Sequence, residues 1–158
     1  MNTDMKRRVF LKGSLAAGTV GMAVTAGLLT PQAVLAAWPE KAFQAKKADE
    51  ALSAAFGMGQ TEASDKIKIK APDIAENGAV VPVTVTTDIP GVESIAIMAS
   101  ANNSPLVALF NLGKSTKADI STRIKMGKTG DVVAVVKAGG KLYANRKGVK
   151  VTIGGCGG

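Results

Sequence analysis

Hydrophobic and polar residues alternate with a period of two through most of the chain after residue 65, as they do in strands that bury one face. The first alternating run is 66–70, where isoleucines alternate with lysines, and the second is 81–86. Pro82 lies in the second run and has no backbone N–H, so we expect this strand to lie at a sheet edge or to carry a bulge. Further runs follow at 95–99, 106–112, 120–126, 132–137, 141–144 and 149–153.

Turn-forming residues separate these runs. They include Pro90-Gly91, the segment 102–105 and Gly139-Gly140, which suits a two-residue hairpin because both positions tolerate positive φ. Short strands at intervals of about 8–12 residues with such turns are typical of a β-sandwich. The predicted fold class is therefore all-β, an antiparallel β-sandwich of immunoglobulin-like size.

A helical period precedes the strands. Apolar residues recur at spacings of three and four between Trp38 and Phe56, and charged residues lie between them. Pro39 suits the first helical position, and Gly57 suits the end. We expect one N-terminal helix over 38–56, packed against the sandwich.

The first 36 residues have the pattern of an export signal. The paired Arg7 and Arg8 precede a moderately apolar stretch over 13–29, and Val34-Leu35-Ala36 offers small residues at a cleavage site. Paired arginines indicate the bacterial twin-arginine exporter and hence the periplasm. A membrane anchor is the alternative, which the glycines and threonines of the apolar stretch disfavour. The expected divisions are a signal peptide at 1–36, a helix-plus-sandwich domain at 37–153 and a terminal arm at 154–158.

Charge and composition argue against several classes of protein. Removal of residues 1–36, which hold four basic residues and one acid, takes the formal net charge from +8 to +5. The lysines are scattered and aromatic residues are few, so a nucleic-acid interface is not expected. The chain has no histidine and one cysteine, which removes the usual ligands of a transition metal or an iron–sulfur cluster. We expect no metal and no cofactor.

The candidate chemistry lies in the last five residues. Cys156 stands between two pairs of glycines, Gly154-Gly155 and Gly157-Gly158. Glycine has no Cβ and no preferred sign of φ, and the segment has no apolar side chain to dock, so we expect the thiol to be presented on a swinging arm. One cysteine cannot form an internal disulfide, so in an oxidising compartment it is reactive or pairs with another chain.

With this terminus, the twin-arginine signal and the all-β pattern, the chain resembles the SoxY family, the sulfur-carrier subunits of the periplasmic Sox thiosulfate-oxidising system. The specific match is the segment 151–158, Val-Thr-Ile-Gly-Gly-Cys-Gly-Gly; segments 71–83 and 121–126 also look like family segments. The resemblance implies that Cys156 is the site of covalent sulfur attachment and that Gly154, Gly155, Gly157 and Gly158 form the arm.

The resemblance also implies partners. A SoxY protein forms a heterodimer with SoxZ, SoxAX couples thiosulfate oxidatively to the cysteine, and SoxB hydrolyses off sulfate. A SoxCD-type dehydrogenase, where present, oxidises the remaining sulfur. The chain would then be a non-catalytic carrier, which agrees with the absence of a histidine or helix N-terminus next to Cys156 in sequence to activate its thiol.

Three alternatives remain at this stage. Cys156 could form a plain intermolecular disulfide in an exported interaction protein, although four glycines raise the entropic cost of a structural link. Gly157-Gly158 could be activated as in ubiquitin-like sulfur carriers, but the periplasm supplies no ATP. A cysteine enzyme is disfavoured because no Cys–His pair can form.

Overall fold

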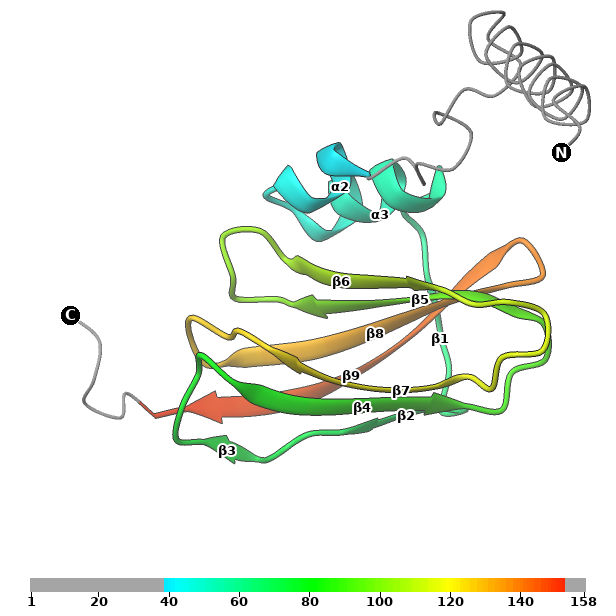
Figure 1. The fold of residues 1–158 in the computed structure, drawn as a ribbon. Coiled ribbons are helices and arrows are strands. Elements are labelled where there is room, and N and C mark those ends of the chain that lie inside the picture. The colour runs from blue at the N-terminus through cyan, green and yellow to red at the C-terminus, as the bar shows by residue number, and fades with distance from the viewer. Residues whose placement is uncertain (1–38, 153–158) are drawn as a thin grey trace, which may run out of the picture. The chain divides into compact units, whose positions relative to one another are not determined.

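The computed structural model describes residues 39–152, and these form two short helices and nine strands (Figure 1). The predicted signal peptide at 1–36 and the predicted arm at 154–158 lie outside the described residues. The helices are α2, Glu40–Gln44, and α3, Ala48–Phe56. The strands are β1 Glu62–Ala63, β2 Ile67–Lys70, β3 Ile74–Ala75, β4 Val81–Thr87, β5 Val92–Ala99, β6 Leu106–Asn111, β7 Asp119–Ile124, β8 Gly130–Ala138 and β9 Lys141–Val151.

The prediction of one continuous helix over 38–56 is wrong, because the described part of this segment is two helices. The backbone is extended at Ala45 (φ −57°, ψ 140°) and again at Lys47 (φ −118°, ψ 147°). Ala42 and Ala51 are both fully buried. In a continuous helix, nine residues at about 100° each would place them on opposite sides. The break lets both helices turn their small apolar residues to the sheet, and Gly57 ends α3 in the left-handed conformation, as predicted.

The β-sandwich prediction is confirmed. One sheet has the strand order β1-β9-β8-β5-β6 with β3 also paired to β9, and the other has the order β2-β4-β7. The predicted runs pair antiparallel, whereas β1 and β3, two residues each, were not predicted and run parallel to β9. The segment 73–78, which lies between two of the predicted runs, therefore contains the strand β3.

The hairpin at Gly139-Gly140 joins β8 to β9 as predicted, with φ of 57° and 75°. The structure differs after it, because the two predicted runs 141–144 and 149–153 are one strand that continues to Val151; Ile153 lies outside the described residues. The residues between the two runs lack alternation. They are strand because each pairs in register with the uninterrupted strand β8.

The prediction that the strand containing Pro82 lies at a sheet edge or carries a bulge is wrong for the strand as a whole. Strand β4 lies between β2 and β7, and its pairing to β7 is regular at Pro82, opposite Arg123. The proline is tolerated because β2 pairs only as far as Thr84, so beside Pro82 the ladder on that side has already ended.

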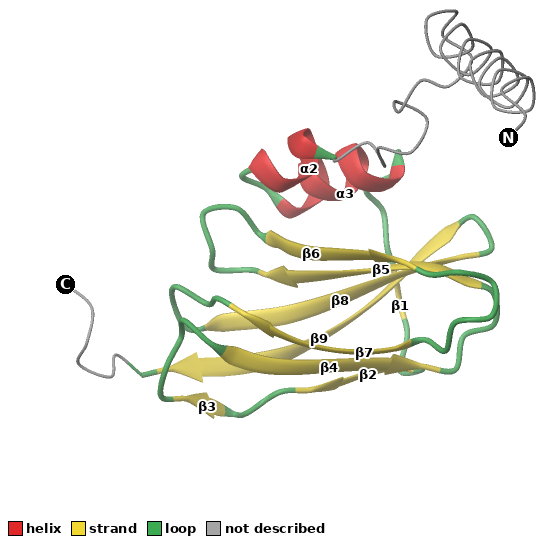
Figure 2. Cartoon of the chain, in the orientation of Figure 1, coloured by secondary structure: helices red, strands yellow, loops and turns green. Residues whose placement is uncertain are grey.

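Strand β5 is buried on both faces and separates two apolar clusters. Ile95 and Ile97 point into the core between the two sheets, while Ala96 and Met98 lie under the helices. Figure 2 shows the helices together on one side of the strands. Met98 and Met126 are core residues, and both are at most 2% exposed. The described domain thus has three layers, helices, large sheet and small sheet.

Candidate functional site

The predicted site residues all lie outside the described residues. This holds for Cys156, for the arm glycines Gly154, Gly155, Gly157 and Gly158, and for Arg7 and Arg8. The last described residue is Thr152, two residues before Gly154. What the structure describes is therefore the base from which the predicted arm leaves, which we call the arm base: the end of β9 and the segments that contact it.

Strand β3 holds the arm base on one side. Ile74 and Ala75 pair in parallel with Lys150 and Val151. The backbone N–H of Lys150 donates to the carbonyl oxygen of Asp73 at 2.9 Å, and that of Thr152 donates to the carbonyl oxygen of Ala75 at 3.0 Å. The ladder on this side therefore continues to the last described residue.

A threonine hydroxyl holds the other side. Strand β8 begins at Gly130, which pairs with Val149, so no strand residue of β8 lies beside Val151. The hydroxyl of Thr129 takes that place: it accepts from the Val151 N–H at 3.0 Å and donates to the Val151 carbonyl oxygen at 3.3 Å. A hydroxyl can do both because it carries one donor and two acceptor lone pairs.

Gly78 allows the loop before β4 to lie directly against the arm base. Its carbonyl oxygen accepts from the Met126 N–H at 2.7 Å. A Cβ at this position would meet the Met126 carbonyl oxygen and would lie 2.8 Å from Cγ1 of Val151. Glycine is therefore needed here because of a close approach, with no positive φ involved.

Side chains add to this attachment. Lys147 of β9 forms an ion pair with Asp73 at 3.1 Å, which ties the segment before β3 to β9. Val149 is buried and Val151 is half-buried against the core between the sheets. Since both backbone edges and one side-chain face are held, the arm base is a fixed part of the sandwich.

The surface around the arm base is apolar in part and basic in part. The exposed large hydrophobic residues of the described chain are Ile74, 57% exposed, and Val80, 50% exposed. Ile74 lies directly opposite Lys150, and Val80 immediately precedes β4. Lys128 and Lys150 are exposed here, and neither forms an ion pair within residues 39–152.

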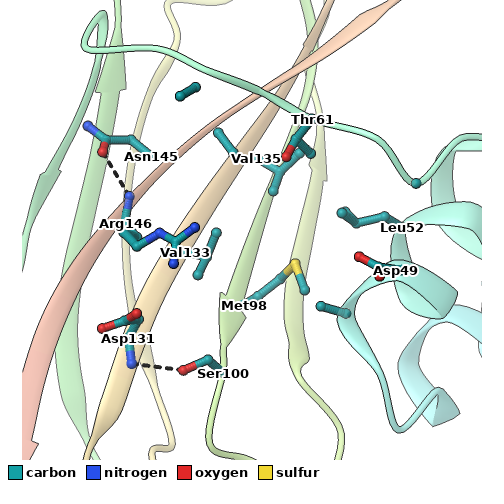
Figure 3. A pocket seen from close by; sticks show the side chains of 14 residues that line it. Asp49, Leu52, Thr61, Met98, Ser100, Asp131, Val133, Val135, Asn145 and Arg146 are labelled. Carbon is teal, nitrogen blue, oxygen red and sulfur yellow. Dashed lines mark hydrogen bonds between the residues drawn. The ribbon is translucent and has the colours of Figure 1, made fainter.

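A separate pocket of about 410 Å³ lies between α3 and the outer face of the large sheet (Figure 3). Its floor is apolar, with Leu52, Met98 and Val133, and its rim carries charged groups, among them Asp131 and Arg146. The Ser100 hydroxyl accepts from the backbone N–H of Asp131 at 2.8 Å. The pocket is a hydrophobic recess with a polar rim, and no lysine, histidine or cysteine is among its lining residues.

The described residues contain no cluster of histidine, cysteine, aspartate or glutamate that could hold a metal ion. Within the same range, no helix is long and apolar enough to cross a membrane. The resolved pKa shift lies far from the arm base, near the β8–β9 hairpin: a hydrogen bond from Lys141 to Glu62, at 2.9 Å, and the charge of Glu62 raise the lysine pKa above its usual 10.5.

Sequence reasoning missed the residues that fix the arm base. Thr129 bonds a strand 22 residues away, and Gly78 is needed because of Val151 and Met126. Neither long-range relation leaves a periodic signal in sequence. Asp73 lies in a polar stretch, where nothing local distinguishes its ion pair with Lys147 from a solvated turn.

Comparisons with known proteins converge on one family. The family profile described as "Sulfur oxidation protein SoxY" matches residues 52–156. The solved structure of the sulfur carrier protein SoxY from Chlorobium limicola f thiosulfatophilum is 52% identical and superposes with a TM-score of 0.62; the match covers 68% of this chain and 97% of that one.

A superoxide reductase (neelaredoxin) from Ignicoccus hospitalis shares the fold at a TM-score of 0.51, with 16% identity over 58% of this chain and 95% of that one. At this identity the likeness concerns the fold alone. Among curated proteins, none matches the chain.

Proposed function

The chain belongs to the SoxY family of sulfur carrier proteins, and from this premise we propose that it is a periplasmic carrier that holds thiosulfate-derived sulfur covalently on Cys156. The family profile runs through Cys156, the one cysteine of the sequence. The observation that carries the proposal is the arm base: the chain is bonded to Thr129 at Val151 on one side and to β3 as far as Thr152 on the other, and the glycine-flanked cysteine follows four residues later.

A carrier needs a fixed base and a thin tether. Four residues after Thr152 place Cys156 at most about 14 Å from it, at about 3.3–3.6 Å per residue. Glycines on both sides of the cysteine add no side chain to the tether, so it can enter a narrow channel of an enzyme. The exposed Ile74 and Val80 beside the arm base supply apolar contact area for such an enzyme.

The loading step is an oxidation. The Cys156 thiol and the sulfane sulfur of thiosulfate form an S–S bond, giving a cysteine S-thiosulfonate; the thiol proton is released and two electrons pass to a SoxAX-type enzyme. Water then cleaves the bond between the sulfane and the sulfonate sulfur on a SoxB-type enzyme. Hydrogen sulfate leaves, and a persulfide, Cys156–S–SH, remains.

Later steps return the carrier to its free thiol. A SoxCD-type dehydrogenase oxidises the terminal sulfur of the persulfide to a sulfonate: water supplies the oxygen atoms, the electrons pass to the dehydrogenase and protons are released. On a SoxB-type enzyme, water then cleaves the bond between the cysteine sulfur and the sulfonate sulfur, so that hydrogen sulfate leaves and the thiol is restored. The chain contributes the sulfur atom of Cys156 and its placement, while the chemistry occurs on the partner enzymes. It is therefore a substrate-carrying protein, paired with a SoxZ-type subunit, and not itself an enzyme.

Export by the twin-arginine route completes the proposal, with Arg7 and Arg8 as the recognised pair. Substitution of both by lysine should leave full-length precursor in the cytoplasm, detected by cell fractionation and intact mass. If the variant precursor is still processed and exported, the twin-arginine route is excluded.

The decisive experiment is the intact mass of the protein purified from periplasm, with and without reductant, after incubation with thiosulfate and the partner enzymes. We expect mass increments of sulfur or thiosulfate on the C-terminal peptide that reductant removes and that Cys156→Ser lacks. Free thiol and a disulfide-linked dimer as the sole products would instead support a plain cross-link between two exported sandwiches.

A further inference from the structure

The sheets of the described domain present several edges, and all but one have features that prevent pairing with another strand. The outer side of β9 is covered by the two-residue strands β1 and β3. Strand β2 carries exposed lysines at 68 and 70, and β7 carries the exposed residues Asp119 and Arg123. Short edge strands and edge charges are the usual means of keeping foreign strands away.

Strand β6 is the exception. It forms one edge of the large sheet, pairs with β5 alone, and contains neither a charged residue nor a proline between Leu106 and Asn111 (Figure 1). A register shift near its start is the single irregularity in its pairing. Such a strand is a template for pairing.

The backbone groups that face outward from β6 follow from its register. Leu112 donates to the carbonyl oxygen of Glu93 at 2.8 Å, so its backbone groups point to β5. Residues directly opposite each other alternate between hydrogen-bonded and non-bonded pairs in an antiparallel ladder. The N–H and C=O groups of Leu109 and Asn111 therefore point away from β5, and no described residue bonds to them.

The side chains of β6 are apolar on both faces and incompletely covered. Ala108 and Phe110 are half-buried against the core between the sheets, and Leu109 is half-buried against the cluster under the helices. A strand added beside β6 would bury the remaining surface of both rows and bond the outward groups of Leu109 and Asn111. Backbone hydrogen bonding and apolar burial thus both favour the addition of a strand beside β6.

We propose that β6 is the docking edge for the permanent partner subunit of the carrier, a second β-rich protein that adds an edge strand of its own to the large sheet. The inference rests on the proposed function, in which a carrier has a SoxZ-type partner. Strands β5 and β8 lie between β6 and β9, so a partner bound at β6 leaves the arm base open to enzymes (Figure 1).

Charges at the ends of β6 favour a foreign strand over a second copy of this chain. Lys46 lies 3.4 Å from the Ser104 hydroxyl just before β6, and Lys114 follows its end. Neither lysine forms an ion pair with any of residues 39–152. Two copies paired about a twofold axis run antiparallel, which brings Lys46 of each copy toward Lys114 of the other. A partner strand flanked by acidic residues meets attraction at both ends instead.

Two variants of β6 test the proposal. Asn111→Pro removes one outward donor at an exposed position, and Asn111→Ala is its control because it keeps the N–H. Val107→Lys places on β6 a lysine of the kind that keeps foreign strands away from β2. Its control is Ser121→Lys, which adds the same charge to the edge strand β7. The dissociation constant for a purified SoxZ-family subunit is measured by titration calorimetry, with urea unfolding as the check on folding.

We expect at least tenfold weaker binding for Asn111→Pro and Val107→Lys, and changes within about twofold for both controls. Unchanged binding in both test variants overturns the docking edge. The proposal is also overturned if the two test variants lose self-association but keep their affinity for the partner, because the edge would then join two copies of this chain. Sulfur loading of Cys156 is read separately by intact mass: a wild-type chain that never loads sulfur contradicts the proposed function, and the binding data still decide the docking edge.

Discussion

Replacement of Thr129 by valine should loosen the arm base without disturbing the sandwich. Valine has nearly the shape of threonine and retains β-branching, so the change removes the hydroxyl and little else. That hydroxyl accepts from the Val151 N–H at 3.0 Å and donates to the Val151 carbonyl oxygen at 3.3 Å. Because Thr129 is exposed, water can replace part of what is lost.

The expected magnitude follows from these two bonds. A hydrogen bond between neutral groups contributes roughly 0.5–1.5 kcal/mol net. Because water can partly replace the exposed Thr129 hydroxyl, we expect the loss of both bonds together to cost no more than this range for one bond. Since about 1.4 kcal/mol corresponds to tenfold in an equilibrium constant, local opening of the β9 end should become about two to ten times more frequent.

Native-state hydrogen exchange measures this opening at single amides. We expect the Val151 amide to exchange about two to ten times faster in Thr129→Val, while amides in the middle of β8, such as Val135, are unchanged. Thr129→Ser keeps the hydroxyl and should exchange nearly as the wild type does. Equal Val151 protection in Thr129→Val and wild type would refute the argument, because the hydroxyl would then not hold the strand end.

Further predictions concern packing, enzyme contact and pH. Gly78→Ala should cost about 1–3 kcal/mol in urea unfolding because its Cβ meets backbone, whereas Gly113→Ala, near one threonine hydroxyl, should cost less than about 1 kcal/mol; equal losses would disprove the close approach. Ile74→Ser, at an exposed position, should leave the unfolding midpoint almost unchanged and lower the kcat/KM of a SoxB-type enzyme for the loaded carrier; an unchanged kcat/KM would exclude this contact. Because the Lys141 pKa is raised in the folded state, the stabilisation by Glu62 is complete below the unfolded pKa of 10.5 and is lost as the pH rises through the folded pKa. The melting-temperature difference between wild type and Glu62→Gln should therefore disappear at high pH, and a difference that grows there would contradict the sign.

The strands were predictable where side chains alternate across a buried face. The run 81–86 is strand β4 within one residue, and Gly139-Gly140 forms the predicted hairpin with positive φ at both positions. These features are local: a pleated strand imposes a period of two, and a tight turn needs glycine. The glycine-flanked Cys156 was also identified from a local pattern, and its role stays a prediction because it lies outside the described residues.

The remaining features depend on tertiary neighbours, which cannot be identified from the local sequence. Strand β3 forms from Ile74 and Ala75 because β9 passes beside them, and residues 145–148 are strand because β8 continues opposite. The break between α2 and α3 exists because two short helices bury more of their apolar residues on one sheet than one straight helix can. In each case tertiary pairing outweighs local pattern.

In the proposed carrier, the bonds at the end of β9 also determine how long the predicted arm is. With Thr152 held by Ala75 and Val151 held by Thr129, the tether to Cys156 is four residues and reaches about 14 Å at most. If residues 150–152 detached, the tether would start at Val149, seven residues before the cysteine, and the volume open to the thiol would rise about fivefold, as the cube of the length. The effective concentration of the cargo at a docked enzyme would fall in proportion. We therefore expect the side chain of Thr129 and the backbone of Asp73 and Ala75, none of which touches sulfur in the proposed reaction, to set the concentration at which each enzyme would meet the cargo.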